Sequence, residues 1–213
     1  MITLINLEDR QKWEAERRKR IGGSDAAAIM GMGYISNTEL WEIKTGRREQ
    51  KDISGLDVVR YGVEAEPLLR DLFRLDFPEY AVKYDGNAMY INDEYPFAHA
   101  SLDGLLWDDD GRKGILEIKT ANITNSIQSA KWKDRIPDNY YCQILWYMGV
   151  MEADFAILKA QLKYDYEELR VVTKHYHIER EEVKEDIKLI LAEGERFYRY
   201  IKEDERPPLE IKM

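Results

Sequence analysis

The 213-residue sequence contains a single cysteine, Cys142, and only three histidines. One cysteine excludes an intramolecular disulfide and any zinc or iron–sulfur site built from several thiolates. No segment approaches the roughly 18 apolar residues of a membrane-spanning helix. Residues 1–6 also lack the basic and apolar regions of a signal peptide. We therefore expect a cytoplasmic protein with no membrane partner.

Positive charge is also scarce, because 32 Lys and Arg are outnumbered by 41 Asp and Glu, which gives a net charge of −9. This balance argues against binding of nucleic acid by bulk attraction. A DNA enzyme of this composition would have to concentrate its basic groups in one channel. Internal repeats and linker-like tracts are missing as well, so we expect one domain over residues 1–213.

The most informative stretch holds two short apolar segments, residues 99–107 and 114–119, around an acidic, glycine-containing turn. This pattern predicts a β-hairpin. Asp103 interrupts the first strand, where Asp is normally rare. Glu117 and Lys119 project from one face of the second strand, while the residue between them points to the opposite layer. Folding of the hairpin is expected to bring Asp103 beside Glu117.

Two adjacent carboxylates raise each other's pKa unless a cation lies between them. Mg²⁺ is usually held by one or two carboxylates together with water and substrate phosphates. A lysine beside such an ion can orient or deprotonate a water aimed at phosphorus, as in metal-assisted phosphodiester hydrolysis. The order of Asp103, Glu117 and Lys119 resembles the core of the PD-(D/E)XK nuclease superfamily, with Leu102 in the place of its usual Pro. An ordinary solvated hairpin is the alternative.

A basic amphipathic helix is predicted over residues 8–20 and ends at two glycines. Ser24 or Asp25 is then expected to cap a second short helix over residues 26–30. The segment is either a plain helix–turn–helix corner or an anion site. Backbone N–H groups, a serine hydroxyl and a nearby guanidinium together make a good phosphate receptor.

The spacing of Trp13, Arg17 and Ser24 resembles the opening signature of the YqaJ-like viral recombinase family. In that family the Arg and the Ser, seven residues apart, bind the 5′-phosphate of a DNA end. The resemblance therefore implies that Arg17 and Ser24 form a 5′-phosphate pocket.

A helix is predicted over residues 61–75, and its buried face is expected to consist of Leu68, Leu69, Leu72 and Phe73. Glu66 precedes Pro67 as it would in a first helical turn, which by itself explains the carboxylate. In the resembled family, however, a Gly-X-X-X-Glu at this place supplies an acidic residue to the metal site. Gly62 and Glu66 match that motif, and the spacing favours Glu66 over Glu64.

A further helix is predicted to begin at Pro137 and to end at Met151. Its Tyr140 and Gln143 match a family Tyr-X-X-Gln, in which the Gln lies beside the active site and would hydrogen-bond water, the lysine or a phosphate oxygen. Ser101 belongs to the same signature as Asp103 and is a secondary candidate.

Four signatures in family order imply an α/β fold of the PD-(D/E)XK type, with a central mixed β-sheet flanked by helices. Residues 80–92, 154–163 and 169–178 are expected to supply further strands, and residues 120–133 a loop. The domain is expected to comprise an N-terminal helical part with the phosphate pocket (8–50), a catalytic core (60–178) and a C-terminal helix (179–206).

The resemblance also implies a mechanism and a setting. Glu66, Asp103, Glu117 and the backbone carbonyl of Ile118 would hold one or two Mg²⁺, or Mn²⁺ in their place, and Lys119 would position the attacking water. The enzyme would degrade one strand of duplex DNA in the 5′→3′ direction from a 5′-phosphorylated end. A trimeric ring, a single-strand annealing partner and a phage or prophage origin are further implications.

Three alternatives stay open from the sequence. The chain could be an endonuclease or a RecB-like nuclease module that acts on other DNA ends. It could be a DNA-end-binding protein without catalysis, although the intact triplet of Asp103, Glu117 and Lys119 argues against this. A purely structural domain would leave the Asp103–Glu117 pair without a compensating cation, which is costly.

Overall fold

The computed structural model describes residues 1–7, 10–166 and 168–210; residues 8 and 9 of the first predicted helix lie outside this set. The strands are β1 (Ile2–Asn6), β2 (Ala81–Lys83), β3 (Ala88–Asn92), β4 (Gly104–Trp107), β5 (Lys113–Ile123), β6 (Phe155–Tyr164) and β7 (Arg170–Glu179). The helices are α1 (Arg10–Arg18), α2 (Gly23–Ile29), α3 (Asn37–Lys44), α4 (Asp57–Asp76), α5 (Ser126–Ala130), α6 (Asp138–Met151) and α7 (Arg180–Lys202).

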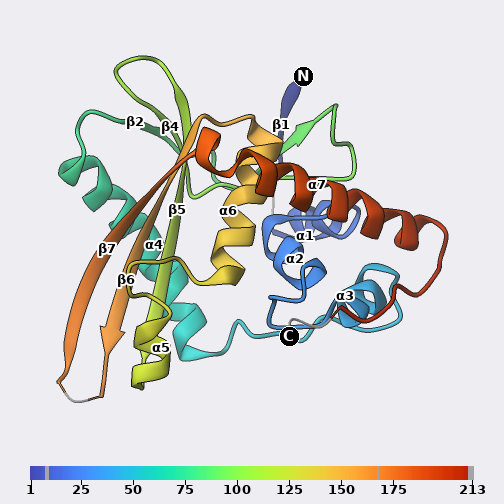
Figure 1. Cartoon of the computed structure of the whole chain (residues 1–213), viewed down its shortest axis with the longest axis horizontal. Helices are drawn as coiled ribbons and strands as arrows, with labels where there is room; N and C mark the ends of the chain where they lie inside the picture. The colour runs from blue at the N-terminus through green and yellow to red at the C-terminus, as the bar shows by residue number, and fades with distance from the viewer. Residues whose placement is uncertain (8–9, 167, 211–213) are drawn as a thin grey trace.

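Five strands form the central sheet in the order β2-β4-β5-β6-β7. β5 and β6 run parallel, and the other neighbours are antiparallel, so the sheet is mixed as predicted. α4 lies along one face, and α6 covers the other (Figure 1). None of the helices in the described part of the chain has both the length and the apolar character needed to cross a bilayer.

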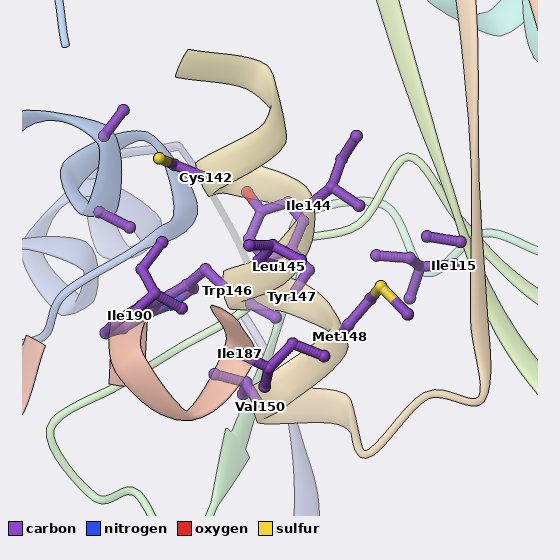
Figure 2. Packing of buried hydrophobic residues seen from close by; sticks show 14 of the residues in the cluster. Ile115, Cys142, Ile144, Leu145, Trp146, Tyr147, Met148, Val150, Ile187 and Ile190 are labelled. Atoms are coloured by element: carbon purple, nitrogen blue, oxygen red, sulfur yellow. The ribbon is translucent and has the colours of Figure 1, made fainter. Parts of the chain in front are cut away.

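α6 is buried on nearly all sides because it is a middle layer of the fold. Figure 2 shows its side chains between Ile115 of β5 and Ile187 and Ile190 of α7. Trp146 is fully buried, and a Cβ on Gly194 of α7 would come within 2.4 Å of its ring. A helix in this position needs apolar residues all round, which explains why its pattern is only weakly amphipathic.

α4 differs from its prediction at both the start and the buried face. The helix begins four residues before position 61, so Pro67 lies well inside it and not in a first turn. Leu68 and Leu72 are 65% and 48% exposed, and their predicted burial is wrong. The side chains that pack against the sheet are those of Ala65, Leu69 and Phe73.

The strands around the central hairpin also differ from the prediction. β4 begins only at Gly104, so Asp103 lies in the bend before it and not within a strand. β5 continues to Ile123 and α5 follows, so the loop predicted over residues 120–133 is wrong. Residues 80–92 contain two strands that pair elsewhere, because β2 joins β4 and β3 joins β1 in a separate two-stranded sheet.

Candidate active site

The two faces of β5 place Ile118 and the Glu117–Lys119 pair in different layers. Ile118 packs in the cluster under α4, whereas Glu117 and Lys119 point to the side covered by α6. The antiparallel register pairs Gly104 with Leu116, and one further step sets Asp103 opposite Glu117. The Asp103 carboxylate accepts the Ile118 N–H at 2.7 Å. The hairpin therefore brings the two carboxylates together, as the sequence predicted.

Glu117 is held by two donors although it is only 2% exposed. Its Oε1 accepts from Lys119 Nζ at 2.5 Å and from Gln143 Nε2 at 2.6 Å. The same Gln143 amide also donates to the Tyr147 hydroxyl at 3.3 Å. Gln143 is thus brought to the acidic cluster from the second turn of α6, where the motif placed it.

Glu66 reaches the cluster from α4, on the opposite layer. Gly62 lies one turn earlier, where a Cβ would stand 3.2 Å from Thr120 Oγ1 of β5. The glycine lets α4 approach the end of β5 closely, which explains the Gly-X-X-X-Glu spacing physically. Glu66 forms an ion pair with Arg70, and Arg70 Nε donates to the Asp103 carbonyl at 2.5 Å. The competitor Glu64 is exposed.

The carboxylates of this site are electrostatically strained. Burial and then the Asp103 charge raise the pKa of Glu66 to about 7, although Arg70 opposes the rise. Burial raises the pKa of Glu117 to about 8, with Asp103 adding to the effect and Lys119 opposing it. The pKa of Asp103 is also raised, chiefly by burial. Burial alone would lower the pKa of Lys119, but Glu117 and Asp103 together raise it, so Lys119 stays an ammonium.

The donor set fits a hard, partly hydrated cation. Three carboxyl groups with raised pKa values lie in one electrostatic unit, and an added positive charge would relieve their repulsion. Among the described residues no three His, Cys, Asp or Glu side chains are arranged as a ready metal cage. Carboxylate and water oxygens are the usual ligands of hard divalent cations, whereas zinc sites in proteins usually include His or Cys.

Arg17 and Ser24 come together at the junction of α1 and α2. Arg17 Nη2 donates to the Ser24 hydroxyl at 2.6 Å, and its guanidinium lies 5.1 Å from the centroid of the Trp13 ring. Neither Ser24 nor Asp25 is the N-cap, because α2 begins at Gly23 with Gly22 as its cap residue. The predicted capping role is therefore wrong, and the Ser24 side chain is directed to Arg17 instead.

Asp25 follows Ser24 in α2, but its carboxylate forms an ion pair with a lysine and not with Arg17. Its buried carboxylate pairs with Lys44 Nζ at 2.6 Å and accepts the Gly22 N–H at 2.9 Å. Lys44 also donates to the carbonyls of Arg17 and Arg20, which fixes the end of α1. Arg17 forms no ion pair with a carboxylate among the described residues, which leaves its guanidinium able to bind an anion.

The Arg17–Ser24 pair and the acidic cluster share a wall. A Cβ on Gly23 would lie 2.6 Å from the Tyr147 ring and 2.8 Å from Gln143 Cγ. The backbone next to Ser24 therefore rests on the two residues that adjoin Glu117. Burial raises the pKa of Tyr147, and Arg17 is close enough to oppose this rise.

The secondary candidates have different surroundings. Tyr140 lies beside the site, with Lys119 Nζ 5.4 Å from its ring centroid. The buried Ser101 hydroxyl has no hydrogen-bond partner among the described residues. Sequence reasoning missed Arg70, which is 5% exposed and links Glu66 to Asp103. The only local signal for it was its position one helical turn after Glu66.

The mixed sheet, with Glu117 and Lys119 on β5 and Asp103 just before β4, has the fold of the PD-(D/E)XK nucleases. Two solved structures share it. The alkaline exonuclease LHK-Exo from Laribacter hongkongensis matches with a TM-score of 0.59 and 19% identity, over 91% of this chain and 97% of the other. A phage related exonuclease from Haemophilus somnus 129PT matches with a TM-score of 0.54 and 16% identity, over 87% of this chain and 96% of the other.

The family model for the YqaJ-like viral recombinase domain matches residues 12–154, and the chain belongs to this family. A relative, the protein YqaJ of Bacillus subtilis (strain 168), is 33% identical over 169 residues. That match covers 75% of this chain and 50% of the relative, so this chain spans about half the length of YqaJ.

Proposed function

We propose that this protein is a metal-dependent exonuclease that degrades one strand of linear duplex DNA in the 5′→3′ direction from a 5′-phosphorylated end. Mg²⁺ is the proposed ion, with Mn²⁺ able to replace it. The product would be a 3′ single strand for recombination of the phage type. Family membership and the fold of the two exonucleases support the general activity.

The observation that carries this proposal is the shared wall between the Arg17–Ser24 pair and the acidic cluster. A terminal phosphate held by Arg17 and Ser24 would lie on one side of Gln143 and Tyr147, and the cluster lies on the other. A receptor for a terminal phosphate at this distance from the cluster would place the scissile bond near the end of the DNA. The arrangement therefore favours attack close to a DNA end.

Each residue has a role that its contacts support. Asp103, Glu117 and Glu66, with the Ile118 carbonyl, would hold the cation, which when bound supplies stabilisation of the charge that develops at phosphorus and on the leaving oxygen. Lys119 is an ammonium beside Glu117 and would orient the attacking water. Gln143 fixes the Glu117 carboxylate. Arg17 and Ser24 would grip the 5′-phosphate through charge-assisted hydrogen bonds.

The direct test is digestion of duplex DNA with Mg²⁺, in which linear DNA with 5′-phosphate ends, linear DNA with 5′-hydroxyl ends and closed circles are compared. We expect rapid loss of phosphorylated linear DNA, slow attack on hydroxyl ends and intact circles. Cutting of circles would move the protein to the endonuclease function. No cleavage with either Mg²⁺ or Mn²⁺, together with retained end binding, would favour a DNA-end-binding protein.

Lys119→Ala tests the catalytic part of this proposal. It should lower the cleavage rate at least about 100-fold, as the loss of one preorganised donor does in other enzymes. Binding of DNA ends should change little, because Lys119 bonds to Glu117 and not to Arg17 or Ser24. Cleavage at a near-normal rate would remove Lys119 from the mechanism.

Arg17→Ala tests the phosphate pocket. A hydrogen bond to a charged group contributes about 1.5–3 kcal/mol, so the preference for phosphorylated over hydroxyl ends should fall roughly 10- to 150-fold. Arg18→Ala is the matched control, because it removes the same charge from the next position of α1. Equal effects of the two variants would reduce the pocket to general attraction for DNA.

Assembly and setting complete the proposal. By family resemblance we propose a homo-oligomeric ring, trimeric, that encloses DNA and works with a single-strand annealing protein in the cytoplasm of a bacterial host. Three exposed leucines on α4, Leu68, Leu72 and Leu75, offer an apolar surface for a second copy. Light scattering after gel filtration should give a trimeric mass, and a monomer at assay concentrations would refute the ring.

A further inference from the structure

Beside the site, one aromatic ring is both exposed and held in place. Tyr34 is 87% exposed, the highest value for a large hydrophobic side chain among the described residues. Its hydroxyl lies 3.2 Å from that of Tyr140 and accepts from Asn139 Nδ2 at 3.3 Å. The end of the side chain is thus fixed by α6, while the faces of the ring meet solvent.

The loop that carries Tyr34 is anchored to the core. The Met32 N–H donates to the Ala27 carbonyl of α2 at 2.8 Å. A Cβ on Gly33 would stand 2.7 Å from the backbone of Ala28, so the loop is packed directly onto α2. A ring presented by such a loop loses little conformational freedom when a ligand stacks on it, which favours binding.

Tyr140 links this ring to Lys119, the lysine proposed to orient the attacking water. Tyr140, which contacts the Tyr34 hydroxyl, has Lys119 Nζ 5.4 Å from its ring centroid. The centroid of the Tyr140 ring also lies 5.5 Å from that of the buried Trp132 ring, so Tyr140 packs against the core. Tyr34 therefore lies one side chain away from the site proposed for the scissile phosphate.

A hollow of about 260 Å³ adjoins the ring and carries basic side chains. Gly33 and Asn139, which flank or contact Tyr34, belong to its lining, and its charged residues are Lys131, Arg135 and the acidic Asp138. Lys131 is exposed, whereas Arg135 shares its charge with Asp138 at 3.6 Å. An aromatic platform beside positive charge is the usual construction for binding single-stranded nucleic acid, in which bases stack and the backbone follows the basic groove.

We infer that Tyr34 and the adjoining hollow form a nucleobase-stacking subsite for a nucleotide next to the scissile phosphate. The ring would stack on an unpaired base, and Lys131 would face the backbone of the same strand. This inference rests on the proposed function, because it assigns part of the DNA substrate to a surface beside the acidic cluster. It adds recognition of a base to a site otherwise built for phosphates.

The test pairs a change in the protein with a change in the DNA. Tyr34→Leu removes the aromatic faces, and an abasic nucleotide placed at successive positions near either end of a 5′-phosphorylated duplex removes one base at a time. Binding is measured by fluorescence anisotropy in a Lys119→Ala background with Mg²⁺, so that the DNA stays intact. Tyr34→Phe keeps the ring and removes the tethering hydroxyl, which separates stacking from the hydrogen bonds.

We expect Tyr34→Leu to weaken binding of natural DNA about 5- to 100-fold, the range found for aromatic residues that stack on bases. At one position the abasic nucleotide should weaken binding to the Tyr34-containing protein by a similar factor and leave Tyr34→Leu unaffected. Tyr34→Phe should keep most of the affinity. Normal binding by Tyr34→Leu would overturn the subsite. It would also be overturned if, at every abasic position, the DNA change weakened binding by the same factor in Tyr34→Leu as in the protein that keeps Tyr34.

Thermal unfolding of each variant checks that the fold is retained, and digestion by the protein with Lys119 intact is scored separately. Cleavage of phosphorylated linear DNA without coupling between Tyr34 and any base would refute the subsite alone. Coupling without cleavage would support the subsite in a DNA-end-binding protein and refute the proposed nuclease.

Discussion

Arg70 provides the sharpest test of how the acidic cluster is held together. Its guanidinium pairs with Glu66, donates to the Asp103 carbonyl and lies 3.5 Å from the centroid of the Tyr84 ring. Breaking a buried ion pair costs about 3–5 kcal/mol. Glu66 is 29% exposed and can be partly rehydrated, so we expect Arg70→Gln to cost about 3 kcal/mol, at the lower end of that range.

In a chain of this length about 1 kcal/mol corresponds to a shift of about 2–4 °C in the melting temperature. Arg70→Gln should therefore lower the melting temperature of metal-free protein by roughly 6–12 °C. Arg74→Gln is the matched control, because Arg74 lies one turn later on α4 and its pair with Asp71 is exposed. That change should cost less than about 1 kcal/mol.

Divalent metal separates an electrostatic role of Arg70 from a packing role. If Arg70 compensates the carboxylates, Mn²⁺ supplies part of the missing charge and should narrow the gap between Arg70→Gln and the parent protein. Arg70→Lys should recover part of the loss, because a single ammonium keeps the charge but loses the guanidinium fork. Equal melting temperatures for Arg70→Gln and Arg74→Gln, or a gap that Mn²⁺ does not change, would refute this reasoning.

Two further predictions follow from the same site. Glu117 releases its proton near its ordinary pKa of 4.5 in the unfolded chain, whereas its pKa in the folded protein is about 8. The free energy of unfolding of the protein with metal removed by a chelator should therefore fall as pH rises through this interval. In urea unfolding at pH 5 and pH 8, Glu117→Gln should reduce the difference between the two free energies. A free energy of unfolding that rises with pH over this interval would contradict the raised pKa of Glu117. Gly23→Ala should lower the free energy of unfolding by about 1–3 kcal/mol and slow cleavage, because the added Cβ would collide with Tyr147 and Gln143. Gly55→Ala is the control, because a Cβ there meets nothing within 4 Å, and it should change neither urea unfolding nor digestion.

Local pattern was sufficient for the parts of the site that lie on one element. The alternation around Ile118 predicts which side chains of β5 share a face, and the structure agrees. Pro137 and the apolar run after it predict the start and length of α6, which carries Gln143 to the cluster. Each of these features depends on neighbours in the sequence, so a local reading finds them.

The features that were missed depend on how elements meet. Arg70 follows Glu66 by four residues and reads as an ordinary surface pair, because nothing nearby in sequence says that α4 crosses the end of β5. Leu68 and Leu72 fit helical spacing as well as the row that is buried, and only the sheet decides between them. β1 pairs with β3, some 86 residues away by the partners Leu4 and Tyr90, and no local pattern predicts that choice.

The two faces of β5 have a consequence for insertions and deletions. Because side chains alternate along a strand, the loss of one residue of β5 before Glu117 would shift the register and exchange the two faces of the strand. Ile118 would then enter the acidic cluster, and a charged neighbour would enter the apolar layer under α4. The exposed turn around Gly111 lies between the two strands, so a change in its length leaves the alternation within β5 intact. Length variation in this hairpin should therefore be confined to its turn, with the strand kept at a fixed count.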